Sequence, residues 1–237
     1  YWGTAGSGGG LIRITASAVT NNGVIAADGG APPGGYPSGS GGGIRIDATV
    51  LAGTGVLRAN GGDTTGTCGG GGRIALYYNA GDFNVLSNVS ARGGEKWSGG
   101  GGCGTVYLKQ PGQLGTVRIV SHGALVGAWT PLGTPSDQTA CFENVVIAGS
   151  NVLVMPEHQM PVVASNMHLQ RGTWLTHHPV SADTTYSLNL ASGVLTLDDG
   201  ATIDVTARGY LRGYTQGNST NGAATGQSAG SYGGMGI

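Results

Sequence analysis

A 32-residue repeat in the first half of the chain is the feature that most constrains its fold. Apolar residues return at this spacing in one column, which contains Ile12, Ile44, Leu76 and Leu108. A second column keeps the same step, at Ile25, Leu57 and Val89. A fixed period of this length is typical of solenoids, in which each repeat stacks on its neighbours. We therefore expect an all-β fold, a parallel β-helix or β-solenoid, whose first coils share one register without insertion or deletion.

Each repeat contains a strand with one apolar face. Ile44 and Ile46 alternate with Arg45, Asp47 and Thr49, which predicts an inward apolar face and a solvated outward face. Glycine runs flank these strands, and glycine supplies 49 of the 237 residues. Because glycine inside a strand or helix costs conformational entropy, helix is the least favoured outcome. We expect the runs to form Gly-rich loops or a packed layer of polyglycine backbone.

The second half of the chain has a shorter cycle. Beyond about residue 115 the 32-residue step is lost, and Gly149, Gly172 and Gly193 each separate two apolar segments. We predict a Gly-rich solenoid with 32-residue coils over 1–115, followed by a β-helix with shorter ~22-residue coils over 116–210. A Gly-rich connector to a next unit follows over 211–237. The expected total is about 7–8 coils.

Charge and hydropathy argue against several classes of partner. Eleven basic and twelve acidic residues give a formal net charge of −1, so no long-range field attracts nucleic acid or an anionic membrane. No apolar run approaches the roughly 20 residues that a membrane span requires. Few charged residues and many Ser, Thr and Asn residues favour a secreted protein, so we expect an extracellular or cell-surface location.

One outward column would carry three cations and an aromatic ring. The 32-residue step places Arg13, Arg45, Tyr77 and Lys109 at equivalent positions, about 4.8 Å apart from one coil to the next. As a ligand stripe, this column would bind an anionic surface glycan. As ordinary surface it is a solubilising row, which is the more common role of exposed basic residues.

A second set of equivalent positions lies just before the Gly-Gly pairs. These positions hold Asp28, Asn60 and Arg92. Stacked Asn or Asp side chains at a coil corner bond neighbouring backbone groups. Because an arginine in the third coil would interrupt such a ladder, we interpret the three as turn residues.

Three cysteines are an odd number and do not predict a disulfide framework. Cys68 and Cys103 each flank a run of four glycines, and the repeat places Cys103 three residues from the position equivalent to Cys68 in the adjacent coil. A disulfide between them would hold two glycine loops together outside the cell. Cys141 would then be an unpaired, buried thiol.

No residue pattern predicts catalysis or cofactor binding. Glycoside hydrolysis needs paired carboxylates, but Asp47 is stacked between Thr15 and Asn79 in the 32-residue register. No Gly-x-Ser-x-Gly nucleophile elbow occurs on a predicted strand-to-helix turn, and the glycine runs lack the Lys-Ser/Thr ending of a phosphate-binding loop. We therefore expect no enzyme activity, no catalytic residues and no cofactor.

The histidines and two Asn-x-Ser/Thr triplets are further candidate sites. Four histidines lie in one part of the chain, at His158, His168, His177 and His178. Their spacing does not match a metal-binding signature, so we expect no metal site. Asn88 and Asn218 each begin an Asn-x-Ser/Thr triplet, the acceptor of N-glycosylation in a host that glycosylates.

Glycine-rich motifs with a common pattern occupy residues 7–14, 55–62, 69–78 and 230–234. They resemble a repeat that occurs in tandem in very large secreted or surface proteins of environmental bacteria. In those adhesin-like proteins, comparable blocks are generally regarded as β-helical surface material without a catalytic motif. The resemblance covers about half of the chain and implies a β-helical, structural role, whereas residues from about 115 to 186 depart from the pattern.

Together these features predict a structural subunit or repeat block of an extracellular filament or surface fibre. A β-helix ends in strand edges that need a cap. Head-to-tail stacking of identical units would pair those edges, and Tyr1, Trp2, Tyr232 and Ile237 would lie at the joint. The main expected partner is therefore the protein itself. Two alternatives remain open: an adhesin or module that binds glycans or ice, and a polysaccharide-processing β-helix enzyme.

Overall fold

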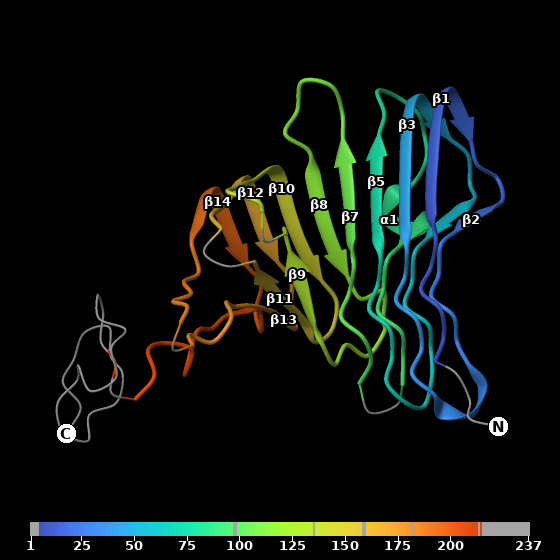
Figure 1. The fold of residues 1–237 in the computed structure, drawn as a ribbon. Coiled ribbons are helices and arrows are strands. Elements are labelled where there is room, and N and C mark those ends of the chain that lie inside the picture. Colours follow the sequence, from blue (N-terminus) through green and yellow to red (C-terminus); the bar gives the residue numbers. More distant parts are fainter. Residues whose placement is uncertain are drawn as a thin grey trace.

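Stacked strands form a β-solenoid of about seven turns, so the predicted fold class is confirmed. The computed structural model describes residues 5–96, 99–134, 136–157, 160–181, 183–212 and 214. An eight-stranded sheet runs along the molecule (Figure 1). Its strands, in spatial order, are β1 (Leu11–Thr20), β3 (Gly43–Ala52), β5 (Arg73–Tyr77), β7 (Thr105–Lys109), β8 (Thr116–Val120), β10 (Ala140–Ala148), β12 (Val162–Leu169) and β14 (Leu190–Leu197).

Two smaller sheets supply the second strand of each coil. The three-stranded sheet contains β2 (Val24–Ala26), β4 (Val56–Arg58) and β6 (Val89–Ser90). The four-stranded sheet contains β9 (Trp129–Leu132), β11 (Val152–Pro156), β13 (Thr173–Leu175) and β15 (Thr202–Ile203). The helical elements of the described residues are a 3-10 turn at Pro33–Gly35 and the helix α1 at Val85–Asn88, which Asn84 caps.

The chain reverses direction where its two halves meet. A hairpin joins β7 to β8, and these two strands pair antiparallel. All other neighbours in the long sheet pair parallel. Figure 1 shows the opposed arrows of β7 and β8. We call the described residues 5–109 the first solenoid and 116–212 the second solenoid; their long-sheet strands run in opposite directions.

The hydrophobic core changes sides at the same place. Val106 packs into the first core with Ile46 and Leu76, whereas the adjacent Tyr107 packs against the second core. Tyr107 lies opposite Val117 in the antiparallel pair, and residues paired in this way share one face of a sheet. The two cores therefore lie on opposite faces of the long sheet. Because strand direction and core side reverse together, both solenoids wind in the same sense about the common axis.

The step between coils of the first solenoid is not uniform. β1 pairs with β3, β4 with β6, and β5 with β7 in the predicted 32-residue register. The pairing of β3 with β5 is shorter by two, so that Ile46, and not Ile44, lies beside Leu76. The prediction of a register without insertion or deletion is therefore wrong. Because the shift is an even number of residues, the inward and outward faces are unchanged.

Two compensating changes in chain length account for this shift. The glycine-rich segment from Leu57 to Ile74 is two residues shorter than its equivalent in the previous coil, from Ile25 to Ile44. The segment from Ile74 to Val89, which contains α1, is two residues longer than its equivalent from Ile44 to Leu57. A deletion of two residues is thus followed by an insertion of two. The constant spacing of the second sequence column concealed both.

The glycine runs pack as a layer of backbone rather than forming open loops. Within one coil, the Gly42 amide donates to the Ala27 carbonyl oxygen at 2.7 Å, and between coils the Gly41 amide donates to the Gly70 carbonyl oxygen at 2.9 Å. Hydrogen bonds therefore run both across the coil and along the stack. A Cβ atom on Gly72 would lie 2.0 Å from a neighbouring carbonyl oxygen. Glycine is needed here because the backbones approach too closely for any side chain.

Side-chain oxygens add further contacts between coils. Asp28 Oδ1 accepts a hydrogen bond from the Asn60 backbone amide at 2.8 Å, and Asn60 Oδ1 accepts one from the Arg92 backbone amide at 3.0 Å. Asp63 Oδ1 accepts one from the Glu95 backbone amide at 2.8 Å. Interpreting Asp28, Asn60 and Arg92 as turn residues without a ladder is therefore wrong. Arginine ends the ladder without breaking it, because it contributes its backbone amide.

The coils of the second solenoid differ in length. Between β10 and β12 the partners Asn144 and Asn166 define a 22-residue step, which agrees with the predicted coil length. The partners Thr116 and Asn144 define a longer, 28-residue step between β8 and β10, and β12 pairs with β14 at the same longer step. Gly193 lies inside β14, and the register makes Gly200 the counterpart of Gly172. Both Gly172 and Gly200 have a φ of 80°, which favours glycine.

Candidate functional site

The two-residue shift splits the predicted outward stripe. Arg13, Arg45, Ala75 and Tyr107 form one column, and Thr15, Asp47, Tyr77 and Lys109 form the next. The prediction that Arg13, Arg45, Tyr77 and Lys109 share a single column is therefore wrong. The shift instead places cations and aromatic rings in neighbouring columns, where long side chains contact each other diagonally.

Arg45 links the two columns. Its guanidinium donates to the Asp47 carboxylate from Nε at 2.7 Å and from Nη2 at 2.9 Å, and its Cζ lies 4.5 Å from the centre of the Tyr77 ring. A cation over an aromatic face is electrostatically favourable. The hydrogen bond with Arg45 lowers the pKa of the Asp47 carboxyl, and the same bond raises the pKa of Arg45. The charge of Asp47 is thus balanced by its neighbour.

Three aromatic rings form a row across the junction of the two solenoids. The ring centres of Tyr77 and Tyr107 are 5.9 Å apart, and those of Tyr107 and Phe142 are 6.3 Å apart, both in edge-to-face arrangements. The Tyr107 hydroxyl donates to the Leu114 carbonyl oxygen at 2.8 Å, and burial raises its pKa. This bond fixes the β7–β8 hairpin against the row.

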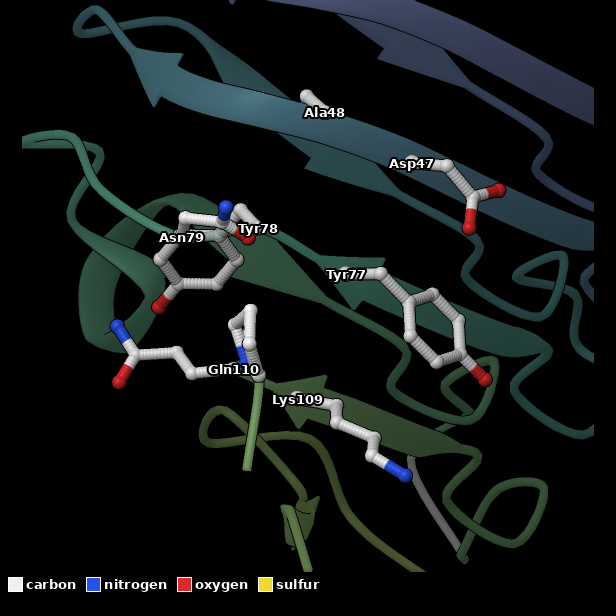
Figure 2. Close-up of a pocket in the computed structure, with 8 residues that line it drawn as sticks. Asp47, Ala48, Tyr77, Tyr78, Asn79, Lys109 and Gln110 are labelled. Atoms are coloured by element: carbon white, nitrogen blue, oxygen red, sulfur yellow. The ribbon is translucent and has the colours of Figure 1, made fainter. Parts of the chain in front are cut away.

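A pocket of about 300 Å³ lies beside Tyr77. It is lined by Asp47, Ala48, Tyr77, Tyr78, Asn79, Lys109, Gln110 and Pro111. Figure 2 shows Asp47, Tyr77 and Lys109 extending from adjacent strands on the same side. With respect to the described residues, the side chains of Asn79, Lys109 and Gln110 have no hydrogen-bond or ion-pair partner. They are free to bind a molecule in the pocket.

A smaller pocket of about 200 Å³ lies at the other end of the aromatic row. Tyr107, Val117 and Phe142 line it from the long sheet, and Leu132 and Thr134 line it from β9 and the following loop. Its lining is largely apolar, because it opens onto the first coil of the second core.

Both outer edges of the long sheet are open in the described part of the chain. β1 and β14 are the outermost strands, and each pairs on one side only. Leu11 is 69% exposed at the first end, and Leu195 and Leu197 are 45% and 42% exposed at the second. Leu195 and Leu197 pair with the buried residues Met167 and Leu169. They are exposed because no further coil of the described residues covers them.

Several residues that the sequence singled out are not among the described residues. Tyr1, Trp2, Tyr232, Ile237, Asn218 and His158 lie outside the described residues, as does most of the predicted connector over 211–237. Asn88 is described and ends α1. Its side-chain nitrogen donates to the Thr54 carbonyl oxygen at 3.2 Å, so glycosylation of Asn88 would have to break this contact between coils.

All three cysteines are free thiols, so the predicted disulfide between Cys68 and Cys103 is wrong. A Cβ atom on Gly101 would lie 2.0 Å from the Gly69 carbonyl oxygen, which aligns these two glycines and leaves the cysteines three residues apart along the stacked segments. Three extended residues span about 10 Å, more than the Cα separation that a disulfide bridges. Cys103 is buried in the second core, which raises its pKa to about 11, whereas Cys141 is exposed and not buried as predicted.

The histidines make separate contacts. His168 Nε2 lies 2.8 Å from Asp198 Oδ1, and His177 Nδ1 lies 2.6 Å from the His178 carbonyl oxygen. The described residues contain no group of three or more His, Cys, Asp or Glu side chains arranged to hold a metal ion. The outward carboxylate of Asp47 pairs with Arg45 rather than with another carboxylate.

Sequence reasoning missed Tyr107 and Phe142. Strand alternation does place Tyr107 outward between Val106 and Leu108, but the fixed 32-residue step drew attention to Lys109 instead. Phe142 reaches the same row because the chain reverses at β8, and no local pattern indicated that reversal.

Comparisons with known proteins identify no relative. No family model matches the chain, and no curated protein or solved structure matches it. Among the described residues, no helix has the length and apolar character that crossing a membrane requires. Function is therefore inferred from the open ends of the sheet and from its outward face.

Proposed function

We propose that the protein is a structural subunit that stacks end to end into an extracellular filament or surface fibre. The pair of open sheet edges carries the proposal. β1 and β14 each leave one edge without a partner among the described residues, and apolar side chains next to these edges are exposed. Such edges are stabilised by pairing with another chain, and burying the apolar side chains adds a hydrophobic contribution. The same contacts would join tandem blocks of a longer protein.

The reversal at β7 and β8 determines how two copies fit. β14 runs opposite to β1, and the two cores lie on opposite faces of the long sheet. A second copy rotated by half a turn about the stacking axis therefore presents its β1 parallel to β14, with core placed on core. The same rotation brings the β2 edge of that copy beside β15. A simple translation would pair only the long sheets and would leave the smaller sheets on opposite sides.

The test is assembly of the purified protein. We expect linear polymers by negative-stain electron microscopy, and a sedimentation coefficient that rises with protein concentration. Leu195→Lys places a charge in the end surface and should keep the protein monomeric, because natural sheet edges are blocked by inward-facing charges. Leu86→Lys is the matched control, because Leu86 is 64% exposed on α1, away from both ends. A wild-type protein that remains monomeric at high concentration would refute the proposal.

The half-turn is tested separately by cross-linking. Val24→Cys on β2 and Thr202→Cys on β15 introduce the required thiols, in a protein whose Cys68 and Cys141 are replaced by serine. With a short bismaleimide, half-turn stacking should give a ladder of covalent oligomers on a denaturing gel. Polymers that form without this ladder would retain end-to-end stacking and reject the half-turn.

The proposal assigns no catalytic role and places the protein outside the cell or on its surface. A low content of charged residues supports this location. The resemblance to glycine-rich surface repeats of bacteria stays a prediction from the sequence.

A further inference from the structure

The pocket beside Tyr77 combines apolar and polar surfaces that suit a sugar ring. Ala48, Pro111 and the rings of Tyr77 and Tyr78 supply its apolar area. A pyranose ring has faces of C–H groups, which pack on such surfaces, and a rim of hydroxyls, which need hydrogen-bond partners. Its volume of about 300 Å³ lies at the lower end of the range for ligand pockets, as expected for one or two ring-sized units.

Polar groups stand around this apolar area without protein partners. The amides of Asn79 and Gln110 each offer donors and an acceptor, and neither is bonded to a described residue. Figure 2 shows both beside Tyr78, with Lys109 extending along the strand next to Tyr77. Groups that are solvated in the free protein exchange water for ligand hydroxyls without losing an internal bond.

The charge of the pocket favours a carboxylate on the ligand. Asp47 and Lys109 are its two charged residues. Asp47 is held by two hydrogen bonds from Arg45, whereas Lys109 belongs to no ion pair among the described residues. Arg45 and Asp47 cancel, so the unbalanced charge at the pocket is the Lys109 ammonium group. An anionic ligand would provide its missing partner.

We propose that this pocket binds a sugar ring that carries a carboxylate, such as a uronic acid unit of an acidic polysaccharide. A nucleic acid fits less well, because the protein has a net charge of −1 and the pocket contains one unpaired cation. The inference does not depend on end-to-end stacking, because every lining residue belongs to one molecule. In a polymer, however, the site would recur along the fibre and weak single contacts would add by multivalency.

The test compares two ligands that differ only in the carboxylates. Cellotriose and its C6-oxidised form, cellotriouronate, are titrated into the protein and followed by calorimetry. We expect the uronate to bind at least about tenfold more tightly, since a hydrogen bond to a charged group contributes roughly this factor. Raising the salt concentration should reduce the difference, because the site is open to solvent.

Two variants locate the effect. Lys109→Met should remove the preference for the uronate while leaving binding of cellotriose unchanged, and Gln110→Ala should weaken both ligands. Lys96→Met is the matched control, because Lys96 is the only other lysine of the chain and does not line the pocket. Thermal melting of each variant verifies folding. Equal binding of the two ligands, no binding of either, or an unchanged preference in Lys109→Met would each overturn the proposal.

Discussion

The first and second solenoids differ in what packs between the strands of each coil. In the first, one side of each coil is a layer of glycine backbone, held by hydrogen bonds in two directions. In the second, inward side chains such as Met167, Leu169 and Leu175 form a larger apolar core. The comparison shows that the same architecture tolerates a wall without side chains, provided that backbone contacts replace them. It also implies that the two halves respond to different substitutions.

The largest expected effect is Gly72→Ala in the first solenoid. The added Cβ would lie 2.0 Å from the Gly42 carbonyl oxygen, so the stacked backbones would have to separate. We expect a loss of at least about 4 kcal/mol in the free energy of unfolding, or failure to fold. Gly10→Ala is the control, because a Cβ there meets no atom within 4 Å. Urea denaturation measures both, and equal stabilities would disprove a packed layer.

Leu169→Ala tests the apolar core of the second solenoid. Leu169 is fully buried, and its removal should cost about 2–5 kcal/mol, because a cavity remains in the core. Leu197, its partner in the next coil, is 42% exposed, so Leu197→Ala should cost roughly 1 kcal/mol or less in the monomer. The same denaturation experiment checks both values. Similar losses at the two positions would show that the second end is covered in solution.

The ladders of polar side chains differ between the halves in what they bind. Asn60 Oδ1 accepts hydrogen bonds from the Arg92 backbone amide and the Ser90 hydroxyl, whereas Asn144 bonds the side chains of Thr116 and Asn166. Asn60→Ala leaves a backbone amide without its partner and should cost about 1–2 kcal/mol. Asn144→Ala should cost less than about 1 kcal/mol, because its partners turn to water. Thermal denaturation measures the loss of stability in both variants. A larger loss for Asn144→Ala than for Asn60→Ala would contradict the prediction.

The smallest effect concerns pH and belongs to the first solenoid. The hydrogen bond from Arg92 lowers the pKa of the Asp63 carboxyl. The ionised form is therefore favoured in the folded state, so its contribution is present above the unfolded pKa of about 4 and is lost as the pH falls through the lower folded value. The Asp63 side chain is 52% exposed, and solvent screening limits the contribution to less than about 1 kcal/mol.

Stability measured from about pH 6 to pH 2 should therefore fall slightly more for the wild type than for Asp63→Asn. If stability fell equally with pH in the two proteins, ionisation of Asp63 would not contribute to the acid sensitivity.

Local patterns were sufficient to predict the fold class but not the register. Alternation around Ile44 and Ile46 identified the inward face, because period-two burial depends on near neighbours only. The length changes before and after β5 are opposite and cancel in any count that starts before β5 and ends after it, so the spacing from Leu57 to Val89 did not reveal them. The same error merged Arg45 and Tyr77 into one column, although they belong to neighbouring ones.

The candidate site depended on long-range geometry that no segment encodes alone. The row of Tyr77, Tyr107 and Phe142 forms because β8 turns back along β7 and the core changes sides. Gly115, with a φ of 94°, lies in that hairpin, but a single glycine in a chain containing 49 of them carries little information. The glycine layer posed a similar difficulty, since composition alone does not distinguish a loop from a packed wall.

The reversal between β7 and β8 separates the length of the molecule from the identity of its ends. Each coil contacts its immediate neighbours, so whole coils can be gained or lost by duplication within either half while the junction and both outer edges stay the same. A gene for such a protein can therefore lengthen or shorten its product in increments of one coil, about 4.8 Å. The spacing of anything carried on the outward face would change with it, and the contacts between neighbouring subunits would not.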